Sequence, residues 1–138
     1  MRAIIVQPDS GTGPSWTGAY VTWEGDPTQA GRRIHRQVSH EFDSDPRAAC
    51  HYYVTQHPSG WYRIGDTTDD NLCYCHGWQP TVERALGLTP TPTDRLLEWM
   101  YVLRPYGMEI RSWRSGPLRT IPWGHTDAWH DDEQAVAA

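Results

Sequence analysis

Runs of apolar residues ended by turn formers predict the first strands of the chain. Residues 3–6 are four apolar residues in a row, and the turn-forming Pro8, Asp9, Ser10 and Gly11 follow them. After a loop rich in Gly, Pro and Ser over 10–18, residues 19–23 are largely β-branched and aromatic, as strand residues tend to be. The pattern therefore predicts a short buried strand and a second strand beyond the loop.

Two Asp-Pro pairs mark predicted helix starts, because Asp is a favoured N-cap and Pro fits the first helical position. After Asp26-Pro27, apolar residues recur every four positions on one helical stripe, at Ala30, Ile34, Val38 and Phe42. After Asp45-Pro46, the segment 47–57 allows two interpretations. The β-branched and aromatic composition of residues 52–55 is typical of a strand, whereas the spacing of the apolar residues along the segment is typical of a helix. The Asp-Pro start and the stop at 58–60 favour the helix.

The second half of the chain predicts a further helix and then a hairpin. Residues 80–88 form at most one short helix, whereas Thr91-Pro92-Thr93-Asp94 has the features of a helix start. The stop residues 104–107 would end that helix, whose buried face would comprise Leu96, Leu97, Met100, Tyr101 and Leu103. Residues 108–113 alternate as a half-buried strand does, and 115–117 turn the chain back into 118–121.

Together these elements predict an α+β fold, in which a small mostly antiparallel sheet carries about three helices packed on one face. We expect a single domain over residues 1–126 and a polar acidic tail over 127–138, because no repeat or domain boundary interrupts the sequence. The length of 138 residues agrees, since a chain of this size buries one core.

Composition and charge narrow the classes of function. Hydrophobic residues make up only 38%, but eight Trp and seven Tyr provide large side chains for a core, so the chain is expected to fold. All 12 basic residues are arginine, which excludes lysine chemistry such as Schiff-base formation. The net charge of −5, without a basic run, argues against nucleic-acid binding.

The cysteines and the apolar runs indicate the compartment. Three cysteines cannot all pair within one chain, and the chain is not a small disulfide scaffold. The apolar start is too short for a signal peptide, and no run approaches the roughly 20 apolar residues that span a membrane. We expect a cytoplasmic protein with no membrane segment, whose thiols are reduced or bound to metal.

The central stretch Leu72-Cys73-Tyr74-Cys75-His76-Gly77-Trp78 contains the densest chemistry. Cys73 and Cys75 would point to one face of a strand. With His76 at the turn and Cys50 (or His51) from a neighbouring element, they predict a tetrahedral zinc site, so Zn²⁺ is the candidate cofactor. The alternative is that the cysteines simply fill the core, as reduced cysteines often do. A thiol nucleophile with His76 as base fits less well, because adjacent strand residues point to opposite faces.

The C-terminal region offers a second candidate metal site, made of His125, His130, Asp131 and Asp132. The pair Gly124-His125 resembles the Gly-His near the C-terminus of peptidoglycan-amidase-like zinc hydrolases. The early histidine of that family would fall near Gln7-Pro8 and is absent here. A solvated acidic tail is the simpler interpretation.

Surplus tryptophan and arginine suggest a binding surface. Eight Trp exceed what the core of so small a domain needs, and Trp and Arg dominate interface hot spots. The candidate binding residues are Trp23, Trp78, Trp123, Trp129, Arg32 and Arg36. The alternatives are that the loop tryptophans cap the ends of the sheet and that the arginines form a solvated helix face.

Three patches carry a resemblance that covers most of the chain. They are residues 20–27 (Tyr-Val-Thr-Trp-Glu-Gly-Asp-Pro), residues 57–61 (His-Pro-Ser-Gly-Trp) with 73–77 (Cys-Tyr-Cys-His-Gly), and residues 101–107 (Tyr-Val-Leu-Arg-Pro-Tyr-Gly) with 116–118 (Gly-Pro-Leu). The chain resembles a family of small proteins without assigned activity from Streptomyces-like actinobacteria and their phages, although Glu24 replaces the usual Asp. The resemblance implies a compact protein of that source, and it favours a helix over 46–57.

These observations lead to two hypotheses of function. The first is a non-enzymatic cytoplasmic binding or regulatory module of actinobacterial or phage type, which acts through a protein partner or a small ligand and carries a candidate structural zinc. It rests on the surplus of loop Trp and Arg and on the lack of a complete catalytic set. The alternative is an amidase-like zinc-dependent hydrolase that uses His125 and the C-terminal Asp and His residues.

Overall fold

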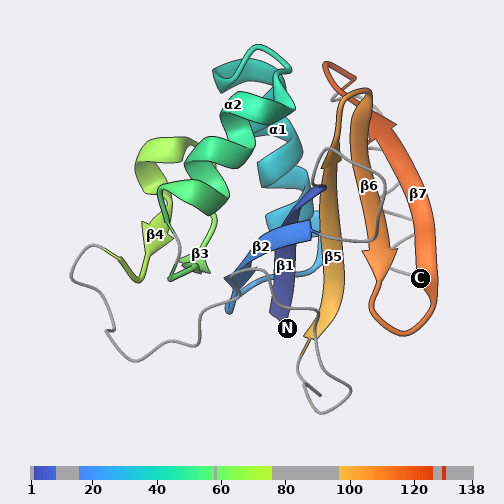
Figure 1. Cartoon of the computed structure of the whole chain (residues 1–138), viewed down its shortest axis with the longest axis horizontal. Coiled ribbons are helices and arrows are strands. Elements are labelled where there is room, and N and C mark those ends of the chain that lie inside the picture. Colours follow the sequence, from blue (N-terminus) through green and yellow to red (C-terminus); the bar gives the residue numbers. More distant parts are fainter. Residues whose placement is uncertain (1, 9–15, 58, 76–96, 126–128, 130–138) are drawn as a thin grey trace.

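The computed structural model describes residues 2–8, 16–57, 59–75, 97–125 and 129, and these residues form one sheet with helices packed on one face (Figure 1). The sheet order is β4-β3-β2-β1-β5-β6-β7. Its strands are β1 (Arg2–Pro8), β2 (Trp16–Val21), β3 (Trp61–Arg63), β4 (Leu72–Cys73), β5 (Leu97–Arg104), β6 (Gly107–Ser112) and β7 (Gly116–Pro122). The predicted α+β class is confirmed.

The described sheet is mixed, in contrast to the mostly antiparallel sheet that the sequence predicts. β1 pairs with β2 antiparallel and with β5 parallel, and β2 pairs with β3 in parallel through Val21 and Trp61. The pairs β3–β4, β5–β6 and β6–β7 are antiparallel. The two parallel pairings connect strands that are distant in the sequence, so no local turn signal reveals them.

The helical layer begins with α1 (Arg32–Glu41), which follows a wide helical turn at Pro27–Gly31. The second helical segment is α2 (Pro46–Cys50) with its continuation His51–Thr55. Its predicted cap is present: the Asp45 carboxylate accepts hydrogen bonds from the backbone N–H groups of Arg47 (2.9 Å) and Ala48 (3.4 Å). Both helices that follow an Asp-Pro pair are therefore confirmed, and they are the two α-helices among the described residues, in place of the three helices predicted.

The helix predicted over the apolar run of residues 96–103 is wrong, because residues 97–104 form strand β5. Tyr101 and Leu103 lie in the core under the helices, whereas Val102 belongs to a second apolar cluster, with Ile4 and Val6. A strand covered on both faces has no polar face, so its continuous apolar run also matches helical spacing. The predicted start at residues 91–94 and the short helix at 80–88 lie outside the described residues.

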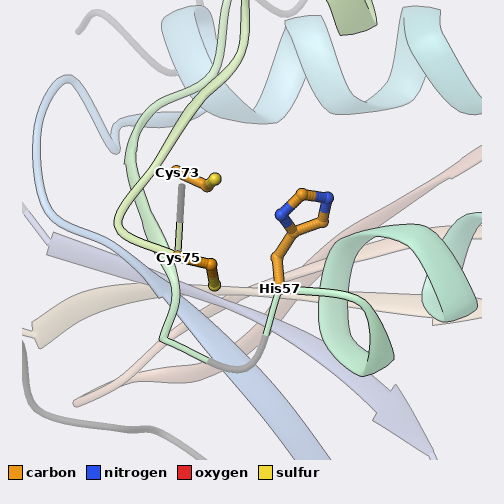
Figure 2. A group of neighbouring side chains, drawn as sticks. All are labelled: His57, Cys73 and Cys75. Carbon is orange, nitrogen blue, oxygen red and sulfur yellow. The ribbon is translucent and has the colours of Figure 1, made fainter. Parts of the chain in front are cut away.

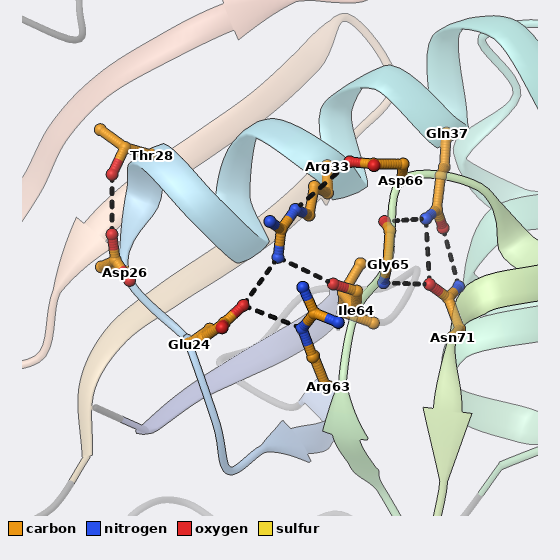
Figure 3. Close-up of polar contacts among 10 residues, drawn as sticks. All are labelled: Glu24, Asp26, Thr28, Arg33, Gln37, Arg63, Ile64, Gly65, Asp66 and Asn71. Carbon is orange, nitrogen blue, oxygen red and sulfur yellow. Dashed lines mark hydrogen bonds and ion pairs between the residues drawn. The ribbon is translucent and has the colours of Figure 1, made fainter.

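A buried amide network connects α1 to the loop before β4 (Figure 3). The Gln37 side-chain amide donates to the Gly65 carbonyl (2.8 Å) and to Asn71 Oδ1 (3.0 Å). In return, Gln37 Oε1 accepts from the Asn71 amide (2.9 Å) and from the Tyr53 hydroxyl (2.5 Å). Asn71 also accepts from the Gly65 N–H (2.7 Å) and donates to the Tyr52 hydroxyl (3.2 Å). This network fixes the point at which the chain enters β4.

A charged cluster holds the end of β3 against α1 (Figure 3). The Glu24 carboxylate pairs with Arg33 and with Arg63, each at 2.9 Å, and Arg33 also donates to the Ile64 carbonyl (3.2 Å). The hydrogen bonds from Arg33 and then Arg63 lower the pKa of Glu24. Because Glu24 lies three residues after the end of β2, these contacts connect the segment that leaves β2 with β3 and α1.

Candidate metal centre

Three metal-ligating side chains converge at the edge of the sheet. One donor atom each from His57, Cys73 and Cys75 lies within 4.8 Å of the other two (Figure 2). All three residues are half-buried. His57 lies two residues after the helical segment that begins at α2 and ends at Thr55. Cys73 ends β4, and Cys75 lies in the bend after it.

Backbone pairing with β3 positions the two cysteines. Cys73 is paired with Trp61 in the β3–β4 ladder, and the Tyr74 N–H donates to the Gly60 carbonyl at 3.1 Å. The Ser59 N–H then donates to Cys75 Sγ at 3.4 Å. A backbone N–H aimed at sulfur stabilises negative charge on it, which suits a thiolate ligand.

The turn between His57 and β3 depends on Gly60. Its N–H donates to the His57 carbonyl (3.0 Å), and its backbone has a left-handed φ of +85°. A Cβ at this position would lie 3.0 Å from the Tyr20 carbonyl oxygen, so glycine suits both the backbone conformation and the close approach to β2. The turn therefore lies between His57 and the strand that pairs with β4, and His57 comes close to Cys73 and Cys75.

Aromatic rings hold the imidazole of His57 in place. Its ring centroid lies 4.3 Å from that of Trp61 and 5.1 Å from that of Tyr52. Trp61 is itself buried, at 1% exposure, and its indole N–H donates to the Tyr53 carbonyl at 3.0 Å. The imidazole thus packs against two aromatic rings, which reduces the conformational entropy that it would lose on ligating a metal.

The three side chains of His57, Cys73 and Cys75 suit a thiophilic metal ion. Two thiolates and an imidazole are the soft and borderline donors that zinc prefers, and Cys₂His with one further position occurs in zinc sites. Three protein ligands leave one of four tetrahedral positions for another donor.

The sequence-predicted metal ligands divide into three groups. Cys73 and Cys75 come together as the zinc prediction requires, whereas His76 lies outside the described residues. Cys50 does not join them: it is 2% exposed in the main core, where burial raises the pKa of its thiol to about 12. Its place on the inner face of α2 explains the difference, because the helix directs this side chain to the sheet.

His57 joins the two cysteines, where the prediction expected Cys50 from a neighbouring element. Sequence reasoning missed it because 15 residues lie between it and Cys73, and nothing local connects the two. The one available signal was the His-Pro-Ser-Gly-Trp patch, whose turn-forming residues predict a reversal of the chain next to a histidine.

The second predicted metal site receives no support from the described part of the chain. His125 is exposed in the turn after β7 and belongs to none of the metal-capable groups found among the described residues. His130, Asp131 and Asp132 lie outside those residues.

Two of the predicted surface tryptophans are core residues. Trp129 is 2% exposed, and Trp123 is buried and donates its indole N–H to the Arg104 carbonyl at 2.8 Å. Both pack against the buried His35, with ring centroids 5.8 Å and 5.4 Å away. They are unavailable to a partner, and Trp129 does not lie in a solvated tail. Trp78 lies outside the described residues.

The remaining binding candidates are at least partly exposed. Trp23 is 53% exposed, and its ring stacks with that of Tyr62 at 6.4 Å between centroids. Arg36 is exposed and Arg32 half-buried on α1. We call Trp23, Tyr62 and Tyr74 the aromatic edge, because Tyr74 contacts Tyr62 edge-on at 6.3 Å and its hydroxyl hydrogen-bonds Thr22.

No family model, curated protein or solved structure matches this chain. Among the described residues, no helix has the length and apolar character needed to cross a membrane. The candidate function therefore rests on the geometry of the site.

Proposed function

We propose that this chain is a zinc-binding module in which His57, Cys73 and Cys75 hold one Zn²⁺. The convergence of their three donor atoms within 4.8 Å carries the proposal. The packed imidazole, the strand pairing of Cys73 and the N–H that donates to Cys75 support it, because each reduces the cost of assembling a metal site. All three cysteines are free thiols in the structure.

The proposed role of the zinc is to stabilise a binding surface rather than to perform a reaction. The metal would tie the end of the α2 segment to β4, two elements otherwise connected through turns and the amide network. Tyr74 stands between the two cysteine ligands and belongs to the aromatic edge. A protein partner or a small ligand of this non-enzymatic, actinobacterial or phage-type module would contact that edge. Its Trp23 is exposed and its two tyrosines are half-buried, and aromatic side chains give large contact area at low entropic cost.

The metal content of the protein tests the proposal. Freshly purified, reduced protein is expected to carry about one zinc per chain, and His57→Ala, Cys73→Ser and Cys75→Ser are each expected to lose it. Cys50→Ala is the matched control: it removes the third thiol, which lies outside the group, and should retain the metal. Reduced wild-type protein without stoichiometric zinc would contradict the proposal, as would equal loss of metal in the Cys50 variant.

Chelation tests the structural role. Metal that connects two elements contributes to folding, so removal of zinc should lower the melting temperature. The aromatic edge should respond as well, with weaker partner binding at a temperature where the protein is still folded. An unchanged melting temperature after complete removal of bound zinc would show that the metal does not stabilise the fold.

A further inference from the structure

We infer that Cys73 and Cys75 form a peroxide-sensitive dithiol whose oxidation to a disulfide releases the metal. The release step rests on the proposed zinc site, whereas formation of the disulfide does not. The reactant is a hydroperoxide, and the same two thiols would thus be both ligands and the site of modification.

The spacing of the two residues permits the bond. Their sulfur atoms lie within 4.8 Å of each other, and one residue separates them in the sequence. Two peptide units span at most about 7 Å between Cα atoms, near the upper limit of disulfide geometry. The chain leaves regular strand structure after Cys73 and bends through Tyr74 and Cys75, which shortens that span. Rotation of the two side chains can then bring the sulfurs together.

Position in the fold separates this pair from the third cysteine. β4 is the last strand at its side of the sheet, and both Cys73 and Cys75 are half-buried, so a small peroxide can reach them. Cys50 is enclosed in the main core, and burial raises its thiol pKa to about 12, which leaves almost no thiolate to attack an oxidant. The chain therefore contains an inert thiol as an internal control.

The reaction is a two-electron oxidation of the dithiol by the peroxide. With hydrogen peroxide, one thiolate attacks one oxygen and takes up its OH group as a sulfenic acid, the O–O bond breaks, and the departing hydroxide takes a proton to become water. The second thiolate attacks that sulfur, the S–S bond forms, the S–O bond breaks, and a second water leaves after protonation. The two sulfurs lose their negative charge and with it their hold on Zn²⁺. A disulfide across one intervening residue is strained, so a cellular thiol can reduce it again.

The structure connects this reaction to the aromatic edge through Tyr74, the residue between the two thiols. The Tyr74 N–H is bound to the Gly60 carbonyl, its hydroxyl hydrogen-bonds Thr22, and its ring contacts Tyr62. Closing a disulfide around Tyr74 changes its backbone and so disturbs these contacts. Oxidation is therefore expected to alter the aromatic edge relative to that of the zinc-bound protein.

The experiment treats reduced, zinc-loaded full-length protein with hydrogen peroxide and follows released zinc with a chromogenic chelator. Peptide mapping under non-reducing conditions locates the modification, and a disulfide removes two hydrogens, about 2 Da. We expect release of the bound zinc in step with a Cys73–Cys75 disulfide, and recovery of both thiols and metal binding after reduction and zinc addition. Cys50→Ala should behave as wild type, whereas Cys75→Ser should form no intrachain disulfide.

Parallel treatment of reduced, metal-free wild-type protein separates this inference from the proposed function. A disulfide in a chain that never retains zinc would support the dithiol and overturn the zinc module. Zinc-loaded protein that retains its metal and unmodified thiols under peroxide would overturn the dithiol and leave the zinc module intact. Stable sulfinic acid at either cysteine without a disulfide would also overturn it.

Discussion

Replacement of Gln37 is the most informative test of how the fold positions the candidate site. Gln37 is fully buried on α1, yet its amide makes four hydrogen bonds that reach the loop before β4. The substitution Gln37→Leu keeps a similar volume and removes every one of them. Asn71 belongs to this network and immediately precedes β4. The substitution therefore acts on the position of β4, the strand that ends at Cys73.

The magnitude follows from the groups that lose a partner. The Gly65 carbonyl and the Tyr53 hydroxyl lose the bonds that Gln37 makes to them, whereas Asn71 still bonds Gly65 and Tyr52. Burial raises the pKa of Tyr53 well above its ordinary value, so its hydroxyl remains a proton donor without an acceptor. Each such buried group costs about 1–3 kcal/mol, so the free energy of unfolding should fall by roughly 2–6 kcal/mol.

Urea denaturation followed by tryptophan fluorescence measures this change. Arg36→Ala, on the exposed face of the same helix, is the matched control and should remain within about 0.5 kcal/mol of wild type. In the double variant Gln37→Leu, Tyr53→Phe the unpaired hydroxyl is gone, so the loss should be smaller than the sum of the single losses. A Gln37→Leu protein as stable as the Arg36 control would refute the reasoning.

Three further predictions concern other parts of the chain. Burial lowers the pKa of His35 in the folded protein below its ordinary 6.5, so between the folded and unfolded pKa values the unfolded chain binds more protons. The free energy of unfolding should therefore fall as the pH drops below about 6.5. Melting curves of His35→Phe should lose that part of the pH dependence. Trp129→Ala should destabilise by about 3–5 kcal/mol in urea titrations, whereas Trp23→Ala, at an exposed ring, should leave stability nearly unchanged; equal effects would contradict the burial described here. Gly60→Ala should lower both the melting temperature and the zinc content, because the left-handed turn places His57; normal zinc binding in that variant would show that the turn tolerates a side chain.

Elements with local signals were predictable from the sequence. The Asp-Pro pairs predicted both helices, and the stripe through Ile34 and Val38 identified the buried face of α1. The hairpin of β6 and β7 followed from alternation and the turn at residues 115–117. These features depend on contacts within a few residues, which periodicity and capping residues record directly.

Features that depend on distant pairing were not predictable. β5 matched a helix because both of its faces are covered, and its parallel partner β1 lies about 95 residues earlier in the sequence. The metal group was found in part, since Cys73 and Cys75 are neighbours in the sequence while His57 is not. Trp123 and Trp129 stand beside turn formers or polar residues, and only their packing against the buried His35 reveals them as core.

X-ray absorption at the zinc edge tests the central claim most directly, because it counts the ligand atoms around the bound metal. In zinc-loaded wild-type protein we predict two sulfur ligands at about 2.3 Å and imidazole nitrogen at about 2.0–2.1 Å. His57→Ala should lose the contribution of that imidazole, and Cys50→Ala should give the wild-type spectrum. Three sulfur ligands, or a shell of oxygen and nitrogen alone, would contradict a site formed by His57, Cys73 and Cys75.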